Sequence, residues 1–290
     1  VDADAIAKAG FTVAVDCINS VGGVVIPELL RALGVKNIIE LNCEPNGRFA
    51  HTPEPIPENL TDIAALVKES GADVGFVVDP DVDRLAIVQD GGEMFGEEYT
   101  LVAIADYVLA HTPGSTVSNL SSSRALRDVT EAHGCTYTAA AVGEVNVTTE
   151  MKRTGAVIGG EGNGGVIYPE LHYGRDALVG VALFLTLMAK TGRKPSEIRA
   201  MMPEYCIYKT KVQLQPGLNV DKLLVQIKEK YADEKITDID GVKIDFADSW
   251  VHLRKSNTEP IVRVYSEAQT PEKAEALANS VKDVILAMID

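Results

Sequence analysis

One segment constrains the fold more than any other: residues 76–88 place three carboxylates at alternate positions between two apolar runs. Phe76-Val77-Val78 precedes the acids and Leu85-Ala86-Ile87-Val88 follows them. Each run has the length and composition of a short buried strand. The carboxylates of Asp79, Asp81 and Asp83 are therefore predicted in a loop at the end of a strand.

Three like charges held this close repel one another, and a divalent cation removes the repulsion. Carboxylate oxygens are hard ligands that suit Mg²⁺. Arg84 follows Asp83 directly and can hold a phosphate beside the metal. The loop therefore predicts a magnesium site used in phosphate chemistry.

Three other interpretations compete for this loop. One alternative is an acidic surface turn without bound metal, since the chain has a net charge of −15. A calcium-binding EF-hand does not fit, because its sixth position should be Gly and is Arg84, and its twelfth should be Glu and is Asp90. An aspartyl-phosphate phosphatase, with Asp79 as nucleophile, remains the main alternative from these residues alone.

The composition favours an α/β protein of two or three domains. The chain has 290 residues, is 46% hydrophobic and is poor in aromatic residues, which fits sheets covered by helices. Its net charge of −15 argues against nucleic acid as a partner. The four cysteines form no metal-type pair, and no apolar run is long enough to span a bilayer. We expect a cytoplasmic protein without membrane contact.

The first two thirds of the chain repeat one theme of strand, helix, strand, helix and then a strand–loop–strand unit. Residues 71–88 close the first copy and residues 155–168 close the second. The linker at 111–115 separates them, so we predict two related three-layer α/β domains, 1–112 and 113–203.

From about residue 204 the pattern changes to strands followed by one long helix. That helix begins with Thr270 as N-cap and Pro271 at the first helical position. We predict a small α+β domain over residues 204–290.

Two further loops can carry chemistry. Residues 159–165 are rich in glycine and contain Glu161 and Asn163, which suits close approach of a sugar, although a simple hairpin turn is equally compatible. Residues 254–260, with Arg263 beyond them, form a dense group of hydrogen-bond donors between two apolar strands. We interpret that group as a phosphate site rather than a solvated turn.

Taken together, the three loops resemble those of the α-D-phosphohexomutases, which include phosphoglucomutases, phosphomannomutases and phosphoglucosamine mutases. Gly160-Glu161 matches the start of the family's sugar loop, although Asn163 and Gly165 stand where Ser and His are common. The acidic loop matches the metal loop, and Arg175-Asp176 resembles a family segment downstream. The phosphate loop matches through Arg254, Ser256, Asn257, Thr258 and Arg263.

The resemblance implies three related α/β units followed by a C-terminal domain of the TATA-binding-protein-like type, of which this chain resembles the second to fourth. It implies Mg²⁺ on Asp79, Asp81 and Asp83, and Arg84 as a catalytic residue. It also implies a hexose or hexosamine phosphate substrate, whose phosphoryl group moves between C1 and C6 through a bisphosphate. The implied substrate ligands are Glu161, Asn163, Arg175, Arg254, Ser256, Asn257, Thr258 and Arg263.

One departure affects function. The family's first domain carries a phosphoserine in a segment of the Ser-His-Asn-Pro type, and the present sequence contains no such segment. The resemblance therefore implies that an N-terminal phosphoserine domain is missing and that this chain alone is inactive. A non-catalytic protein that binds sugar phosphates remains an alternative.

Overall fold

A computed structural model describes residues 1–215, 217–256 and 259–289. The chain divides into two compact units. The first unit contains residues 1–139 and 143–203, and the second contains residues 140–142 and those from 204 onward.

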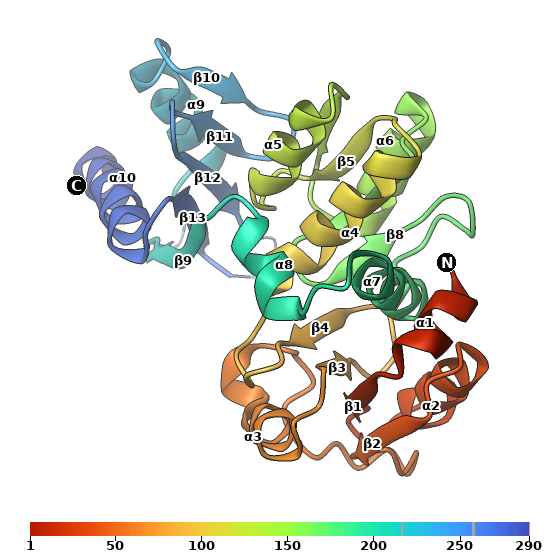
Figure 1. Ribbon diagram of the computed structural model, residues 1–290. Helices are drawn as coiled ribbons and strands as arrows, with labels where there is room; N and C mark the ends of the chain where they lie inside the picture. Colours follow the sequence, from red (N-terminus) through yellow and green to blue (C-terminus); the bar gives the residue numbers. More distant parts are fainter. Residues whose placement is uncertain (216, 257–258, 290) are drawn as a thin grey trace. The chain divides into compact units, whose positions relative to one another are not determined.

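The first unit begins with a four-stranded sheet in the order β2-β1-β3-β4 (Figure 1). Strand β1 pairs in parallel with β2 and β3, and β4 turns back antiparallel to β3. The strands are β1 (Thr12–Asp16), β2 (Asn37–Leu41), β3 (Val74–Val78) and β4 (Leu85–Val88). The helices are α1 (Ala3–Ala9), α2 (Gly22–Ala32), the 3₁₀ turn η1 (Pro57–Asn59) and α3 (Thr61–Ser70).

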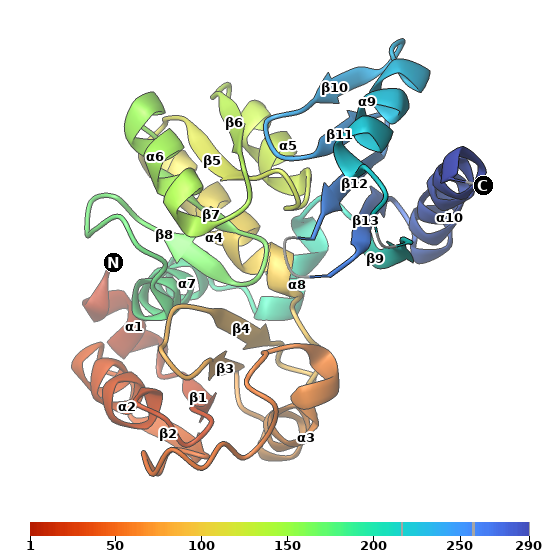
Figure 2. The ribbon, with the colours of Figure 1, turned by 180° about the vertical axis from the view of Figure 1, so that it is seen from behind.

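A second sheet of the same unit repeats this plan in the order β6-β5-β7-β8 (Figure 2). Strand β5 is parallel to β7, and β8 is antiparallel to β7. Its elements are β5 (Thr116–Asn119), α5 (Ala125–Ala132), β6 (Tyr137–Ala140), α6 (Glu144–Thr154), β7 (Ile158–Glu161) and β8 (Gly165–Ile167). The predicted repeat is therefore present in the topology.

The strand order explains the layers of the first sheet. The chain moves from β1 outward to β2 and then returns past β1 to β3. Because crossovers between parallel strands are right-handed, connections running in opposite directions place α2 and α3 on opposite faces of the sheet. The order reverses between β1 and β3, and ligands of such sheets bind beyond the carboxyl ends of the strands at that point.

Two long helices join the sheets. Helix α4 (Glu97–His111) packs on β4, β7 and β8, and α7 (Ala177–Thr191) packs on β4 and β8. Both are buried around most of their circumference, as expected of helices enclosed by other elements. Asp176 caps α7 by accepting hydrogen bonds from the Leu178 and Val179 amides, at 2.7 and 3.2 Å. Helix α8 (Pro195–Met201) completes the unit.

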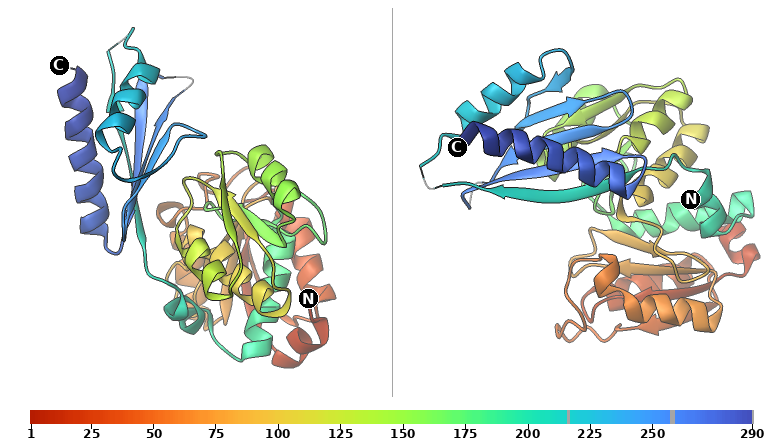
Figure 3. Two further views of the ribbon diagram at one scale, coloured as in Figure 1. Left: turned by 90° about the horizontal axis from the view of Figure 1, so that it is seen from above. Right: turned by 90° about the vertical axis from the view of Figure 1, so that its left-hand side faces the viewer.

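The second unit has a five-stranded antiparallel sheet in the order β10-β11-β12-β13-β9. The strands are β9 (Cys206–Gln213), β10 (Lys235–Thr237), β11 (Val242–Asp245), β12 (Trp250–Lys255) and β13 (Ile261–Ala268). Helices α9 (Val220–Lys230) and α10 (Pro271–Ile289) pack on the same face of this sheet (Figure 3). Alternate strand residues, among them Val251, Leu253, Val262 and Val264, form the core beneath them.

The predicted α/β class and the separate antiparallel C-terminal domain are confirmed. The domain boundaries at residues 112 and 203 stay predictions. Helices α6, α7, α8 and α9 and strands β6 and β10 have no counterpart among the predicted elements. Within the described ranges, no helix combines the length and the apolar character that crossing a membrane requires.

Candidate functional site

Polar residues gather at the reversal point of each sheet in the first unit. In the first sheet β1 ends at Asp16, and Asp79 follows β3. In the second sheet the corresponding strands β5 and β7 end at Asn119 and Glu161. The acidic and Gly-rich loops therefore occupy equivalent positions, as the sequence repeat predicted.

A hydrogen bond spans each reversal point. In the first sheet the Ser20 hydroxyl donates to the Pro80 carbonyl at 2.7 Å. In the second, the Gly162 amide donates to the Ser122 hydroxyl at 2.9 Å. Each pair ties the chemical loop to the neighbouring loop of its own sheet, which fixes its position relative to the sheet.

Asp79 organises the acidic loop. Its Oδ1 accepts hydrogen bonds from the Asp83 and Arg84 amides, both at 3.1 Å, and its Oδ2 accepts one from Arg84 Nε at 2.6 Å. The residue is only 1% exposed. A carboxylate engaged by three donors is a poor nucleophile, so this geometry disfavours the aspartyl-phosphate alternative.

The three carboxylates of the loop can serve one cation. Asp79, Asp81 and Asp83 each place an oxygen within 4.8 Å of the others. Oxygens on opposite sides of a bound Mg²⁺ lie about 4 Å apart, so the spacing suits a small divalent ion. Burial, with the negative charge of Asp79, raises the pKa of Asp83 to about 6. A cation here therefore competes with a proton for Asp83.

Val82 gives the acidic loop its shape. Its φ of 61° is in the left-handed region, which is unusual for a β-branched residue. Two backbone hydrogen bonds hold it: its amide donates to the Asp79 carbonyl at 3.1 Å, and its carbonyl accepts from the Ala177 amide at 3.0 Å. Backbone strain of this kind is concentrated at functional sites.

The Gly-rich loop presents Glu161 from a buried position. The residue is 5% exposed, and its Oε1 accepts from Asn119 Nδ2 at 2.8 Å and from the Gly143 amide at 3.1 Å. Asn163 closes the loop by accepting from the Gly165 amide at 3.2 Å. Glu161 is thus fixed in one orientation, with its Oε2 directed away from these two donors.

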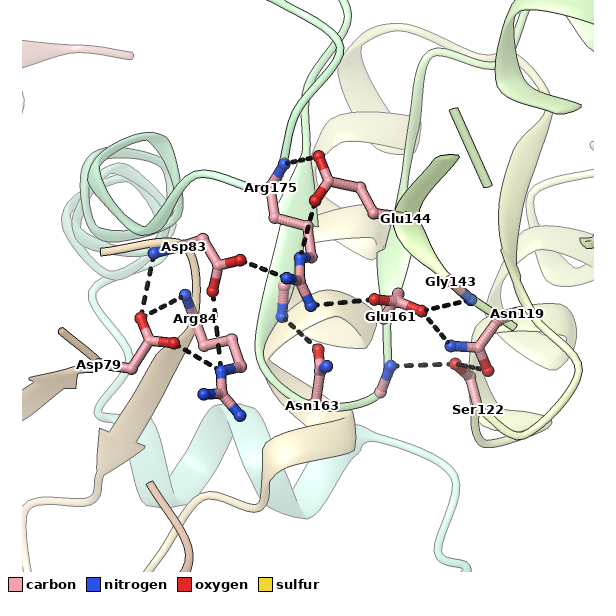
Figure 4. Close-up of polar contacts among 12 residues, drawn as sticks. Asp79, Asp83, Arg84, Asn119, Ser122, Gly143, Glu144, Glu161, Asn163 and Arg175 are labelled. Atoms are coloured by element: carbon pink, nitrogen blue, oxygen red, sulfur yellow. Dashed lines mark hydrogen bonds and ion pairs between the residues drawn. The ribbon is translucent and has the colours of Figure 1, made fainter. Parts of the chain in front are cut away.

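Arg175 connects the two loops (Figure 4). Its Nη1 donates to Glu161 Oε2 at 3.0 Å, and its Nη2 donates to Asp83 Oδ2. Its Nε lies 3.3 Å from Glu144 Oε2. One guanidinium group therefore neutralises carboxylates from the acidic loop, the Gly-rich loop and the start of α6.

The structure also shows site residues that the sequence reasoning missed. Asn119 and Ser122 hold the Gly-rich loop, and Glu144 holds Arg175, whose amide also donates to it at 3.2 Å. A signal existed for the first two, because they lie at the end of the first strand in the second copy of the repeat, next to the strand that ends in Glu161. Glu144 had no signal, because it begins a helix that was not predicted.

The predicted phosphate loop belongs to the second unit, between β12 and β13. Arg254 is half-buried, with its Nε 3.0 Å from Asp240 Oδ2. The Ser256 hydroxyl accepts from the Glu259 amide at 3.2 Å. Arg263 is exposed, and its Nη1 donates to the Tyr265 hydroxyl at 3.4 Å. The predicted ligands Asn257 and Thr258 lie outside the described residues.

Three family models cover most of the chain. Residues 1–92 match the phosphoglucomutase/phosphomannomutase alpha/beta/alpha domain II. Residues 96–205 match alpha/beta/alpha domain III, and residues 211–284 match the C-terminal domain.

Relatives of similar sequence have corresponding names. A phosphoglucomutase/phosphomannomutase of Thermococcus kodakarensis is 37% identical over 276 residues, which are 94% of this chain and 60% of the relative. A probable phosphoglucosamine mutase of Methanopyrus kandleri is 32% identical over 97% of this chain and 63% of its own. The chain thus spans about 60% of the length of these curated relatives.

Solved structures agree in fold. A phosphoglucomutase/phosphomannomutase family protein from Burkholderia thailandensis superposes with a TM-score of 0.84 at 27% identity, covering 98% of this chain and 63% of that one. An Aspergillus fumigatus N-acetylphosphoglucosamine mutase, solved in complex with GlcNAc-6P and magnesium, superposes at 0.62 with 17% identity, covering 100% of this chain and 65% of that one. On the three matched domains, the chain belongs to the phosphoglucomutase/phosphomannomutase family, of which it contains the second, third and C-terminal domains.

Proposed function

We propose that this chain forms the metal-, sugar- and phosphate-binding part of a phosphohexomutase. Such an enzyme moves a phosphoryl group between C1 and C6 of a hexose or hexosamine phosphate through a bisphosphate. The observation that carries the proposal is the position of Arg175, which contacts both Asp83 and Glu161. The proposed cation site and the proposed acceptor for sugar hydroxyls are therefore neighbours within one compact unit.

The relatives support the substrate class and leave the sugar open. Their names divide between phosphoglucomutase/phosphomannomutase and phosphoglucosamine mutase, with one named as a phosphoglucosamine/phosphogalactosamine mutase. We therefore propose a hexose phosphate or a hexosamine phosphate as the substrate. The four cysteines are free, which supports the proposal of a cytoplasmic location.

Magnesium is the proposed cofactor. The Aspergillus mutase, which was solved with magnesium, supports this, as does the spacing of Asp79, Asp81 and Asp83 in this chain. When bound, the cation would supply positive charge that stabilises the transferring phosphoryl group. Arg84, whose Nε already contacts Asp79, would add a fixed positive charge beside it.

The chain's own residues would bind and orient the substrate. Glu161 would accept hydrogen bonds from sugar hydroxyls, and Asn163 would keep the Gly-rich loop in shape. Arg175 would exchange one of its carboxylate partners for the substrate. In the second unit, Arg254, Ser256 and Arg263, with Asn257 and Thr258, would hold the phosphate that does not react, which orients the other end.

We further propose that the phosphoryl donor is a phosphoserine on a separate domain. With this chain alone, glucose 1-phosphate, Mg²⁺ and glucose 1,6-bisphosphate as primer should give no glucose 6-phosphate. The same chain should bind the bisphosphate in calorimetry when Mg²⁺ is present. Robust turnover by the chain alone would contradict the requirement for a donor domain.

The metal assignment has its own test. Asp81→Asn should weaken Mg²⁺ binding about tenfold or more, because it removes one of three charged ligands. Asp62→Asn, which removes the same charge from an exposed position on α3, should change it less than twofold. Equal effects of the two variants, or no Mg²⁺ binding by the unmodified chain, would overturn the assignment.

A further inference from the structure

Two cysteines lie close together at one edge of the first sheet. Cys17 follows β1 directly, and Cys43 comes two residues after the end of β2, which pairs in parallel with β1. Neighbouring strands are about 4.8 Å apart, and the α-carbons of a disulfide are about 4.4–6.8 Å apart. Cysteines at the same ends of two paired strands therefore start at a separation that a disulfide can bridge.

Hydrogen bonds hold the two cysteines in place. The Cys17 amide donates to the Leu41 carbonyl at 3.3 Å, and the Cys43 thiol donates to the same oxygen, also at 3.3 Å. The Asn19 amide donates to the Asn42 carbonyl at 2.6 Å. A hydrogen bond also joins the two thiols. The folded unit therefore brings both sulfurs together before any covalent bond forms between them.

The backbone beside the two cysteines is strained. Among the described residues, four other than glycine have φ in the left-handed region, and three of these adjoin the pair. They are Ile18, Asn19 and Asn42, with φ of 50°, 55° and 51°. The fourth is Val82 of the acidic loop. Such strain is concentrated at functional sites, and here it marks the cysteine pair as well as the acidic loop.

The two thiols differ in reactivity. Cys17 is fully buried, and its hydrogen bond with Cys43, together with burial, raises the pKa of its thiol. Cys43 is half-buried, and the same hydrogen bond lowers the pKa of its thiol, against burial and the negative charges of Glu40 and Asp16. The thiolate is the attacking form of a cysteine. Cys43 is therefore suited to react first with a molecule from solution.

We propose that Cys17 and Cys43 are a site of reversible oxidation, at which a disulfide forms within the first unit. The oxidant is a low-molecular-weight disulfide such as oxidised glutathione. The Cys43 thiolate attacks one of its sulfurs and releases one glutathione thiolate. Cys17 then attacks the Cys43 sulfur of this mixed disulfide, and the second glutathione leaves with the proton of Cys17. The two cysteines are oxidised, and one molecule of oxidised glutathione is reduced.

The position of the pair connects it with the acidic loop. Ser20, three residues after Cys17, donates from its hydroxyl to the Pro80 carbonyl at 2.7 Å. A disulfide that alters residues 17–20 should therefore shift the amide NMR signals of Asp81 and Asp83. Unchanged signals in the oxidised chain would contradict this connection. Neither the disulfide nor the connection depends on the proposed mutase function.

The test is peptide mapping of the whole folded chain after incubation with mixtures of reduced and oxidised glutathione. Trypsin separates the two cysteines, because it cleaves after Arg31 and Lys36. Peptide 9–31 then contains Cys17, and peptide 37–48 contains Cys43. Oxidation should link these two peptides, and an excess of reduced glutathione should separate them again.

Three variants test the order of the steps. Cys17→Ser lacks the second thiol, so it should retain glutathione on Cys43 as a stable mixed disulfide. Cys43→Ser should leave Cys17 unmodified, because Cys17 is fully buried. Cys135→Ser is the matched control: it removes a half-buried cysteine elsewhere in the first unit and should leave the extent of linkage within about twofold.

Two outcomes with the unmodified chain would overturn the inference. If Cys43 carries glutathione and no linked peptide appears, the second thiol does not reach the first. If the linked peptide appears only in urea, the native fold does not bring the two sulfurs together. Both outcomes are measured without a substitution, so they do not depend on whether a variant folds.

Discussion

The two units use arginine in opposite ways. In the first, Arg175 is half-buried and contacts Asp83, Glu161 and Glu144, so its charge is already neutralised. In the second, Arg263 is exposed, lies opposite two other cations and contacts a neutral hydroxyl. The first arrangement holds loops together through shared charge neutralisation, and the second leaves positive charge exposed at the surface.

The difference predicts opposite consequences when an arginine is removed from each unit. Removing a cation from the first unit leaves several carboxylates without a partner, which is costly. Removing Arg263 from the second unit, where it lies opposite Arg254 and Lys211, relieves repulsion. Four substitutions or changes of condition test this contrast, from the largest expected effect to the smallest.

Arg175→Met should destabilise the first unit by about 3 kcal/mol, because three partly buried carboxylates lose their shared partner. The same change should tighten Mg²⁺ binding several-fold, because Asp83 no longer has a competing cation. Scanning calorimetry with and without Mg²⁺ measures both effects. Arg31→Met is the matched control: its pair with Glu40 is on the surface and should contribute less than about 0.5 kcal/mol. Equal losses would show that Arg175 is not a structural bridge.

Gly164→Ala should cost about 2–3 kcal/mol, from a left-handed backbone and a steric clash. The glycine has a φ of +88°, and a Cβ there would lie 2.5 Å from the Leu85 carbonyl oxygen. Gly155→Ala shares the left-handed backbone, at +65°, but meets nothing within 4 Å, so it should cost about 1 kcal/mol. Urea unfolding of both variants separates the clash from the backbone term. If they lose equal stability, the two loops are not in close contact.

Lowering the pH should destabilise the second unit through His252. Burial, with a contribution from Lys243 and Arg254, lowers the pKa of His252 to about 4 from its usual 6.5. Between these values the unfolded chain binds a proton that the folded unit does not, so stability falls as the pH falls. From pH 7 to pH 5 the loss is about 2 kcal/mol.

Urea unfolding followed by the fluorescence of Trp250 measures this loss, because Trp250 is the single tryptophan of the chain and belongs to the second unit. His252→Gln should flatten the pH dependence, since His252 is the only histidine after residue 203. Parallel pH profiles for the two proteins would contradict the prediction.

Arg263→Gln should leave the stability of the second unit unchanged or raise it by about 0.3 kcal/mol, because the charge that is lost lies opposite Arg254 and Lys211. The same unfolding experiment, at low and at high salt, measures the change. Salt should reduce the difference between the variant and the unmodified chain. If the free energy of unfolding falls by more than about 1 kcal/mol, Arg263 makes a net stabilising contact within the unit and the predicted repulsion is wrong.

Much of this fold was predictable because its signals are local. The strand at 85–88 and the N-cap of the last helix were predicted to the residue, since β-rich runs and the Thr-Pro start are short patterns. The repeat of strand and loop identified the acidic and Gly-rich loops. Helix α7 was missed because it is buried around most of its circumference, and a helix with a narrow polar face has a weak 3.6-residue pattern.

The contacts within the site depend on tertiary structure, so the sequence did not predict them. Asp83 and Arg175 are 92 residues apart in the chain, and only the packing of two sheets brings them together. The resemblance named both residues without indicating that they touch. Glu144 illustrates the limit: its role depends on where α6 begins, and nothing near it in sequence identifies that role.

The backbone hydrogen bonds that join the acidic loop and strand β4 to the Gly-rich loop and the start of α7 have a consequence for how such a protein can diversify. The Leu85 amide donates to the Gly164 carbonyl at 3.0 Å, and the Ala177 amide donates to the Val82 carbonyl at the same distance. These atoms are common to nearly every amino acid, so exchanging side chains leaves the bonds in place. Substitutions at 161–163, in the loop proposed to bind the sugar, therefore leave the hydrogen bonds to the acidic loop in place.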